Sequence, residues 1–264
     1  MPTTSLETEP FPPELLTRLR TCRHLLVLTG AGVSQESGIP TFRDALSGLW
    51  GRFDPAQLAT PEAFDADPAM VWGWYEWRRA QVLLCEPNPA HDAIAALAQR
   101  VPRLTLVTQN VDGLHQRAGS QAVLELHGSL HRPYCRDCGH SHVLCEQAYD
   151  DVPLEGAPLP PPRCDSCGGP LRPGVVWFGE ALPADIWDAA AAAARNCDLV
   201  LVAGTSALVY PAAELPLTAL ARGAVVVQIN PDRTDLDDFA TFRLGGTAAR
   251  VLPELVRQAW PDMD

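Results

Sequence analysis

The sequence has no apolar run that approaches the roughly 20 residues needed for a membrane-spanning helix. Residues 1–14 are acidic and rich in proline, and they contain neither the apolar core of a secretory signal nor the arginines of a transit peptide. These absences predict a cytoplasmic protein that has no membrane partner.

Positive charge is also scarce, because Lys and Arg together number 20 against 32 Asp and Glu, for a formal net charge of −12. Such a surface repels phosphate backbones, so direct binding to nucleic acid is not expected. It would favour basic partners, such as lysine-rich protein segments, but only weakly.

Cysteine is not distributed as a disulfide framework. Four of the eight cysteines form two C-x-x-C pairs, and the others are scattered at positions 22, 85, 145 and 197. This pattern suits a reducing compartment and a metal site. With 264 residues, of which 47% are hydrophobic, the chain can bury a large core, as one domain with an insertion or as two small domains.

Residues 25–28 form an apolar run with the length and type of a buried parallel strand. Gly30 and Gly32, on either side of Ala31, allow a tight turn directly after it and a close approach of backbone to a ligand. Backbone N–H groups there suit a phosphate, which predicts the first strand and phosphate loop of a dinucleotide-binding fold. Because Gln35 replaces the third glycine of G-x-G-x-x-G, this pattern alone also fits an ordinary strand-to-helix turn.

Strands and helices alternate along the rest of the chain. Helices are expected at residues 14–22, 69–84, 88–100, 183–196 and 254–260, and strands at 104–108, 123–126, 199–202 and 225–229. The alternation predicts an α/β fold with a doubly wound, Rossmann-like parallel sheet. Helices punctuated by proline interrupt it between residues 49 and 85.

Polar residues follow the predicted strands at the ends where open α/β sheets bind ligands. A neutral imidazole there is the natural general base near pH 7, although a lone histidine is more often structural. The alternative for the other side chains is that they form ordinary turns. The residues concerned are Gln109, Asn110 and Asp112, His127, Gly204-Thr205-Ser206 and Asn230.

The two cysteine pairs, Cys135 with Cys138 and Cys164 with Cys167, have the spacing of two zinc knuckles. Four thiolates complete a tetrahedral coordination sphere and leave no position for water. The pattern therefore predicts one structural Zn²⁺, with paired disulfides as the alternative.

These motifs, in this order, are similar to the signature of the sirtuins, the NAD-dependent protein lysine deacylases. They are Gly30-Ala31-Gly32-Val33-Ser34, Ser37-Gly38-Ile39-Pro40, Phe42-Arg43, Thr108-Gln109-Asn110-Val111-Asp112, His127-Gly128-Ser129, the cysteine pairs and Gly204-Thr205-Ser206. The resemblance runs from about residue 15 to about residue 253 and implies a flexible tail at 1–12 before one catalytic unit at 13–260. That unit would have a Rossmann-like lobe (about 13–48, 101–130 and 174–260) and a small lobe with a helical part (49–100) and a zinc ribbon (131–173).

The resemblance implies that NAD is a substrate and not a redox carrier. The acyl oxygen of a modified lysine attacks the nicotinamide ribose carbon, and nicotinamide departs. His127 then helps to deprotonate a ribose hydroxyl, which attacks the acyl carbon, and the products are lysine, nicotinamide and O-acyl-ADP-ribose. NAD would contact Gly30, Ala31, Gly32, Ser34, Ile39, Pro40, Phe42, Arg43, Gln109, Asn110, Asp112, Gly204, Thr205, Ser206, Asn230 and Ala248.

The partners that the resemblance implies are acylated-lysine proteins or peptides. An extended substrate would add as a strand, through main-chain bonds that carry little sequence preference. It would lie against Val176, Phe178, Gly179, Glu180 and Tyr210.

Tyr75 and Arg78 stand three residues apart in a predicted helix, so their side chains project from one face. A phenol and a guanidinium together can bind a carboxylate. The pair resembles the Tyr-x-x-Arg of the sirtuin branch that removes succinyl, malonyl and glutaryl groups, and Ala59 matches the small residue that widens that branch's acyl pocket. Alternatively, Arg78 is a solvated charge and Tyr75 packs in the small lobe.

Desuccinylation and demalonylation are therefore expected over deacetylation. An NAD-dependent mono-ADP-ribosyltransferase that uses the same pocket stays open, as does a zinc-dependent interaction module with a vestigial nucleotide site. An ordinary dehydrogenase is disfavoured, because no acidic residue follows a second strand about 20 residues past the glycine loop.

Overall fold

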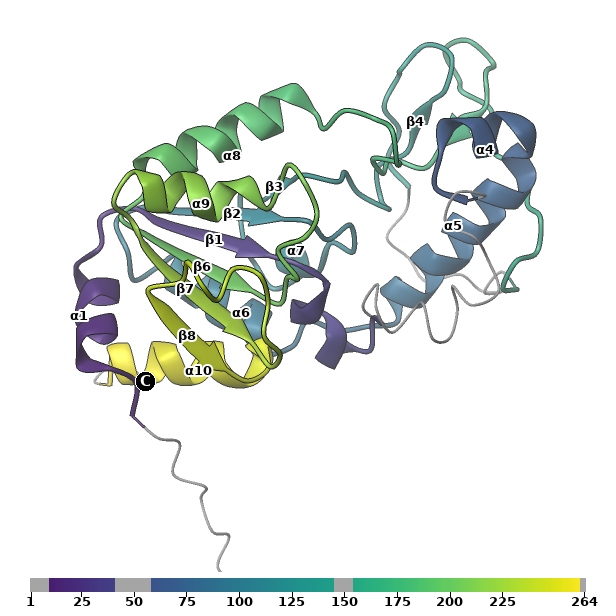
Figure 1. Cartoon of the computed structure of the whole chain (residues 1–264). Coiled ribbons are helices and arrows are strands. Elements are labelled where there is room, and N and C mark those ends of the chain that lie inside the picture. Colours follow the sequence, from purple (N-terminus) through teal and green to yellow (C-terminus); the bar gives the residue numbers. More distant parts are fainter. Residues whose placement is uncertain (1–9, 41–57, 145–153, 262–264) are drawn as a thin grey trace, which may run out of the picture.

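The computed structural model describes residues 10–40, 58–144 and 154–261. Its centre is a six-stranded sheet of order β3-β2-β1-β6-β7-β8, in which every adjacent pair is parallel (Figure 1). The predicted α/β fold with a doubly wound parallel sheet is confirmed. The strands are β1 Leu25–Thr29, β2 Leu104–Thr108, β3 Leu124–Glu125, β6 Leu199–Ala203, β7 Val225–Asn230 and β8 Phe242–Gly245.

Strand β1 lies in the middle of the sheet and is buried along its whole length. Leu25 stands opposite Leu104 of β2 on one side and Leu199 of β6 on the other. Because successive side chains of a strand point to opposite faces, Leu25 and Val27 join one core cluster and Leu26 and Leu28 the other. The strand order reverses at β1, which is where open α/β sheets bind ligands.

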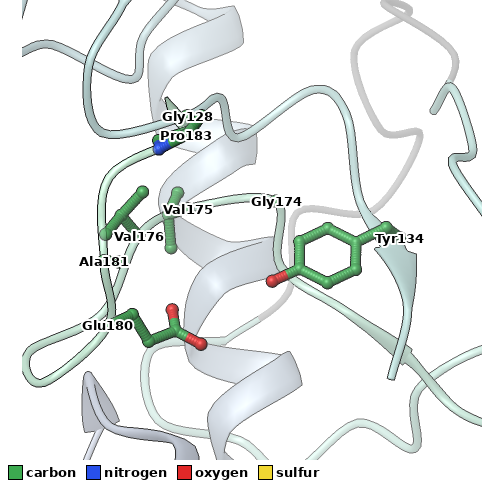
Figure 2. Close-up of a pocket in the computed structure, with 8 residues that line it drawn as sticks. All are labelled: Gly128, Tyr134, Gly174, Val175, Val176, Glu180, Ala181 and Pro183. Carbon is green, nitrogen blue, oxygen red and sulfur yellow. The ribbon is translucent and has the colours of Figure 1, made fainter. Parts of the chain in front are cut away.

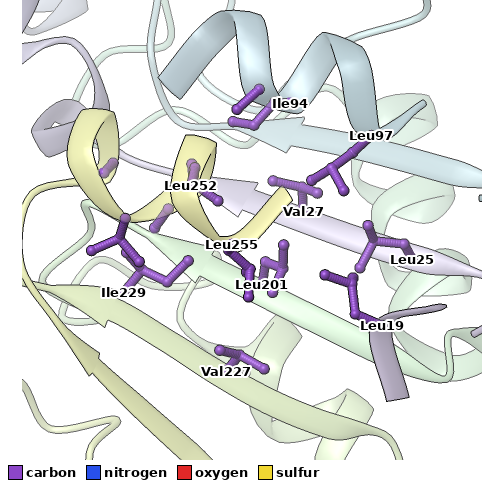
Figure 3. Close-up of a cluster of buried hydrophobic side chains, with 14 of the residues drawn as sticks. Leu19, Leu25, Val27, Ile94, Leu97, Leu201, Val227, Ile229, Leu252 and Leu255 are labelled. Atoms are coloured by element: carbon purple, nitrogen blue, oxygen red, sulfur yellow. The ribbon is translucent and has the colours of Figure 1, made fainter. Parts of the chain in front are cut away.

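Helices cover both faces of the sheet (Figure 1). Helices α1 (Pro13–Thr21), α6 (Pro89–Leu97) and α10 (Ala248–Ala259) pack on one face, and α8 (Ala184–Asn196) and α9 (Glu214–Ala221) on the other. Figure 3 shows the first layer, where Leu252 and Leu255 of α10 and Ile94 and Leu97 of α6 meet the strand side chains. Removal of this apolar surface from water is the main stabilising term of the sheet.

A second group of elements lies beside the sheet (Figure 1). It contains α4 (Pro61–Ala66), α5 (Pro68–Leu83) and an antiparallel pair, β4 (Tyr134–Cys135) with β5 (Leu171–Arg172). We call these elements, with residues 131–144 and 154–173, the small lobe, and the sheet with its covering helices the sheet lobe. The side chain of Thr60 caps α4 and that of Asp67 caps α5, and a proline follows each cap, which fixes both helix starts.

Some elements have other bounds than predicted, and others were missed. The closing helix, predicted at 254–260, begins at Ala248 and contains Pro253, because Val251 and Leu252 pack in the core on the same face as Leu255. The strand predicted at 123–126 pairs only over Leu124–Glu125. Strand β8 and helix α9 were not predicted.

Of the predicted flexible tail, residues 10–12 are described, and the Phe11 backbone N–H donates to Gln258 Oε1 at 2.9 Å. Within the described ranges, no helix has both the length and the apolar character needed to cross a bilayer.

Candidate active site

The loop after β1 and the loop after β6 meet at the carboxyl edge of the sheet. The Gly32 N–H donates to Gly204 O at 2.8 Å, and the Gly30 N–H donates to Ala203 O at 3.1 Å. A Cβ on Gly32 would lie 2.8 Å from Gly204 Cα, and one on Gly204, whose φ is +61°, only 2.4 Å from Val33 N. Only glycine fits this crossing, and the cradle of bare backbone that results suits a phosphate group.

Ser34, Asn110 and Asp112 form a buried hydrogen-bonded cluster beside this cradle. The Ser34 hydroxyl donates to Asp112 Oδ2 at 2.7 Å and accepts from Asn110 Nδ2 at 3.1 Å. Asn110 Nδ2 also donates to Gly30 O at 3.1 Å, which ties the cluster to the glycine loop. Asp112 Oδ1 accepts from the Leu114 N–H at 2.9 Å.

Two buried histidines, neither of them a predicted site residue, lie next to the cluster of Ser34, Asn110 and Asp112. The Asn88 N–H donates to His91 Nδ1 at 3.2 Å as part of the capping box of α6, so neutral His91 carries its proton on Nε2, which lies 3.4 Å from Ser34 Oγ. His115 Nε2 donates to Thr29 Oγ1 at 2.9 Å, and its ring centroid is 4.8 Å from that of His91. The Asn88-x-x-His91 spacing of a capping box is the one signal that could have found this link.

His127 follows β3 and lies near the same edge of the sheet. Its Nδ1 donates to Gln109 O at 2.9 Å, which leaves Nε2 with a free lone pair. Burial lowers the pKa of His127, and the hydrogen bond to Gln109 opposes that shift only in part. The imidazole is therefore neutral at pH 7 and can accept a proton at Nε2.

Two more of the predicted NAD-contacting residues bind the loop after β6, and the other described ones differ in burial. Gln109 Nε2 donates to Thr205 Oγ1 at 3.0 Å, and Asn230 Nδ2 donates to Thr205 O at 2.9 Å, so both side chains join the loop after β6. Ala248 is the buried first residue of α10. Ile39 packs against the apolar cluster of the small lobe, while Ala31 and Ser206 are partly buried and Pro40 is exposed. Phe42 and Arg43 lie outside the described residues.

Helix α5 carries Tyr75 and Arg78 beside Ala59. Ala59 and Tyr75 belong to one buried cluster, and the Ala59 carbonyl accepts the Phe178 N–H at 2.9 Å. The Tyr75 hydroxyl accepts the indole N–H of Trp177 at 3.0 Å, and burial raises the pKa of Tyr75 to about 12. The guanidinium of Arg78 stacks over the Trp74 ring, with Cζ 4.8 Å from the centroid.

The segment of residues 174–180 connects the two lobes. Val176 N donates to His127 O at 2.9 Å. The carboxylate of Glu180, a residue predicted to lie against the substrate, accepts from Arg172 through both oxygens, at 2.5 and 2.9 Å, and from the Trp177 N–H at 2.8 Å. Its carboxylate thus anchors the segment. Phe178, next to Gly179, is 57% exposed, and Tyr210 is 65% exposed.

A cavity of about 420 Å³ lies along this segment, and Figure 2 shows the Tyr134 hydroxyl and the Glu180 carboxylate facing each other across it. Its lining comes from Gly128, from Tyr134 of β4 and from the stretch 174–183, and it contains no residue of the phosphate loop. The lining residues are Gly128, Tyr134, Gly174, Val175, Val176, Glu180, Ala181 and Pro183.

The four predicted zinc ligands come together in the small lobe. The Sγ atoms of Cys135, Cys138, Cys164 and Cys167 all lie within 4.8 Å of one another, and two of the separations are 3.4 and 3.8 Å. Tetrahedral zinc with Zn–S bonds of about 2.3 Å places its sulfurs at about that spacing, so the four thiolates fit one structural zinc ion. None of the described cysteines forms a disulfide.

The sequence model of the Sir2 family matches residues 30–211. An NAD-dependent protein deacylase of Methylococcus capsulatus is 59% identical over 247 residues, which cover 94% of this chain and 96% of that protein. NAD-dependent protein deacylase 1 of Pseudomonas aeruginosa is 58% identical over 240 residues, with 90% and 95% covered.

Solved structures agree with these matches. A Sir2 homologue in complex with NAD superimposes with a TM-score of 0.86 at 47% identity, and 96% of this chain and 95% of that chain are covered. Sir2Af2 bound to a myristoylated histone peptide gives a TM-score of 0.74 at 35% identity, with 94% and 95% covered. Together with the paired loops, the neutral histidine and the four thiolates, these matches show that the chain belongs to the Sir2 family.

Proposed function

We propose that the chain is an NAD-dependent protein lysine deacylase that prefers acyl groups ending in a carboxylate, such as succinyl and malonyl. Membership of the Sir2 family, in which NAD is the co-substrate, and two relatives named as NAD-dependent protein deacylases support the general activity. The acyl preference depends on α5.

Four reduced thiolates also fit the cytoplasmic location that the composition predicts.

His127 is the proposed general base. When bound, NAD supplies a ribose carbon that releases nicotinamide and accepts the acyl oxygen, so that the acyl group finally leaves on ADP-ribose. The Nε2 of His127 takes the proton of a ribose hydroxyl, because Nδ1 already donates to Gln109 O. A base held by one backbone carbonyl keeps a single tautomer and ring orientation.

The buried cluster and the paired loops are the proposed NAD site. Because the N–H groups of Gly30, Gly32 and Gly204 donate to carbonyls within the chain, the pyrophosphate would take N–H groups of neighbouring residues in the two loops. Asn110 and Asp112 would hold the nicotinamide end, with Ser34 fixing the orientation of both side chains. A Sir2 homologue that is 47% identical to this chain was solved with NAD, which supports this location.

The peptide is proposed to bind between the segments around Phe178 and Tyr210. Four exposed apolar side chains occur there: Phe178, Leu208, Val209 and Tyr210. Since the N–H groups of Val176 and Phe178 are used inside the chain, an added strand would donate its own N–H groups to their carbonyl oxygens. Sir2Af2 was solved with an acylated histone peptide, which supports this class of substrate.

The observation that carries the acyl preference is the state of Arg78. Among the described residues, this partly buried guanidinium has no hydrogen bond and no ion pair, and it stacks over the Trp74 ring. Burial lowers the pKa of Arg78, while Tyr75 and Asp112 oppose the shift. A cation that has lost water without gaining a carboxylate is destabilised, and a substrate carboxylate would relieve that cost.

Arg78→Met tests the proposal with matched acetyl-lysine and succinyl-lysine peptides. The loss of a buried charge partner costs roughly 2–5 kcal/mol, at about 1.4 kcal/mol per tenfold, so kcat/KM for desuccinylation should fall by more than tenfold. Deacetylation should stay level or rise, since an acetyl group has no carboxylate. Gln81→Met, on an exposed position of the same helix, is the matched control and should change neither rate.

Equal loss of both activities in Arg78→Met would make Arg78 a structural residue and leave a plain deacetylase. Product analysis separates the ADP-ribosyltransferase alternative. Free O-acyl-ADP-ribose supports deacylation, and ADP-ribose bound to protein supports the transferase.

A further inference from the structure

Tyr75 has a hydrogen-bond partner that comes from the other side of the acyl site. The Trp177 Nε1–H donates to the Tyr75 hydroxyl oxygen at 3.0 Å, and the two residues are 102 positions apart in the chain. Trp177 is 2% exposed and Tyr75 5% exposed, so water does not compete for this bond. Their ring centroids are 6.3 Å apart.

This bond determines which role the phenol can play. A phenolic O–H lies close to the ring plane and has two favoured directions, and the oxygen accepts hydrogen bonds in the same plane. When Trp177 occupies one in-plane direction, the Tyr75 proton must take the other. Among the described residues, no acceptor is hydrogen-bonded to that proton, so it is available to a ligand.

Trp177 is itself fixed by contacts with the small lobe. The guanidinium of Arg172 lies over the indole ring with Cζ 3.5 Å from the centroid, and the same Cζ is 4.8 Å from the centroid of the Tyr134 ring. Arg172 is 3% exposed and binds both carboxylate oxygens of Glu180, and Glu180 in turn accepts the Trp177 backbone N–H. The main chain and the ring of Trp177 are therefore both held, and the direction of its indole N–H is set.

We propose that Trp177 is a positioning residue for acyl selectivity: its indole N–H orients the Tyr75 hydroxyl so that the phenol donates to the terminal carboxylate of a succinyl or malonyl group. This inference rests on the proposed acyl preference and adds a third residue to it. Trp177 touches neither the carboxylate nor NAD and acts only through Tyr75. An acetyl group has no carboxylate to accept the Tyr75 proton, so the bond between Trp177 and Tyr75 should not affect the rate with acetyl-lysine.

A double-mutant cycle tests the inference, with Trp177→Phe, Tyr75→Phe and the double variant. Trp177→Phe keeps an aromatic ring and removes the donor. We expect kcat/KM for the succinyl-lysine peptide to fall about tenfold in either single variant, which corresponds to about 1.4 kcal/mol. The double variant should be no worse than Tyr75→Phe alone, because Trp177 acts only through the hydroxyl. Rates with the acetyl-lysine peptide should stay within about twofold to threefold of the parent.

Equilibrium binding of fluorescent succinyl-lysine and acetyl-lysine peptides without NAD supplies a readout that is independent of turnover. Phe64→Leu is the packing control, since Phe64 contacts the Trp177 ring at 5.6 Å between centroids without a hydrogen bond. It should leave the ratio of succinyl to acetyl binding unchanged. If Trp177→Phe does not fold, 3-benzothienylalanine at position 177 replaces the N–H by sulfur in a ring of nearly the same shape.

Three outcomes overturn the inference. Equal losses for both peptides in Trp177→Phe would give Trp177 a merely structural role, and additive losses in the double variant would mean that it acts elsewhere. A selective loss in Tyr75→Phe with none in Trp177→Phe would leave the proposed acyl preference intact and remove only this inference. The acyl preference itself is tested separately by Arg78→Met, in which equal losses with the acetyl-lysine and succinyl-lysine peptides would contradict it.

Discussion

The two lobes are stabilised by different kinds of interaction. In the sheet lobe, β1 and β6 are buried throughout, and aliphatic helix side chains cover them. In the small lobe, charged groups are buried among aromatic rings: Arg172 lies between Tyr134 and Trp177, and Glu76 pairs with Arg79 at 3.2 Å. Apolar burial has no preferred direction, whereas these contacts depend on fixed angles and partners.

This difference separates stability from selectivity. A non-directional core tolerates small changes of shape and contributes most of the free energy of folding. A directional network holds particular donors, such as the Tyr75 hydroxyl, in one orientation, but it fails when one partner is lost. We therefore expect damage in the sheet lobe to lower stability without changing acyl choice, and damage in the small lobe to change acyl choice.

The largest effect is expected from loss of the metal through Cys164→Ser. Structural zinc contributes about 10–16 kcal/mol of apparent binding energy in zinc-finger peptides, and the small lobe has few other apolar contacts at this end. Metal analysis should find one zinc per parent chain and none in the variant. Hydrogen exchange should rise in β4, β5 and α5 while β1 and β6 stay protected.

Trp72 of α5 packs against Cys135 and Cys164, so the loss should reach the helix that carries Tyr75 and lower deacylation indirectly. Cys197→Ser, at a buried thiol of the sheet lobe, is the control and should leave the zinc content unchanged. A parent protein without stoichiometric zinc would contradict the structural-zinc assignment.

The second largest effect is expected from His127→Ala, a change at the edge of the sheet where the two lobes meet. Removal of a general base lowers the rate by about 10²- to 10⁴-fold, so kcat/KM for deacylation should fall by that factor for every acyl group. The melting temperature and NAD binding should stay near the parent values, because the imidazole contributes little to the core. His140→Ala, at an exposed histidine of the zinc ribbon, is the control, and near-parental turnover in His127→Ala would refute the assignment.

Leu201→Ala tests whether damage in the core of the sheet lobe lowers stability without changing acyl choice. Leu201 is fully buried on β6, and a Leu→Ala cavity typically costs about 2–5 kcal/mol. Denaturant titration should show that loss in the free energy of unfolding. At a temperature where the variant is folded, the ratio of succinyl to acetyl turnover should equal that of the parent. A shifted ratio would show that the sheet lobe also controls acyl choice.

The smallest effect concerns acid stability. Burial lowers the pKa of His115 to about 3, and His91 adds a smaller shift of the same sign. Above pH 6.5 the residue is neutral in both states. Below pH 6.5, the unfolded chain binds a proton that the folded chain does not. The free energy of unfolding therefore decreases as the pH is lowered, by up to about 1.4 kcal/mol per pH unit.

His115→Gln keeps a donor for Thr29 and should flatten the dependence of unfolding free energy on pH between 6.5 and 5. His140→Gln should leave that slope as it is. An unchanged slope in His115→Gln would place the acid sensitivity at other groups.

Much of the sheet lobe could be predicted because its signals are local. The runs that became β1, β2, β6 and β7 are short stretches rich in Leu and Val. The closing helix is the exception, because its predicted start at residue 254 is six residues after the observed start at Ala248, and Pro253 lies inside the helix. The packing of Val251 and Leu252 outweighs the helix-breaking effect of the proline.

Much less of the candidate site could be predicted in detail. The residue types at the strand ends indicated an NAD site, but their partners are remote in sequence. Ser34 and Asp112 are 78 positions apart, and the indole that binds Tyr75 lies 102 positions away. The motif predicts that the substrate lies against Glu180, but no local signal indicates that Arg172 donates to both oxygens of its carboxylate.

The alternation of strands and helices, the two thiolate pairs and the residues at the strand ends follow from the amino-acid order alone. Burial pattern and ligand spacing are properties of neighbouring residues, and they can be read along a chain. Which groups meet depends on the fold: Gly32 with Gly204, Ser34 with Asp112, and Trp177 with Tyr75. Hydrogen bonds act over about 3 Å, and only the packing of both lobes brings such distant residues within that range.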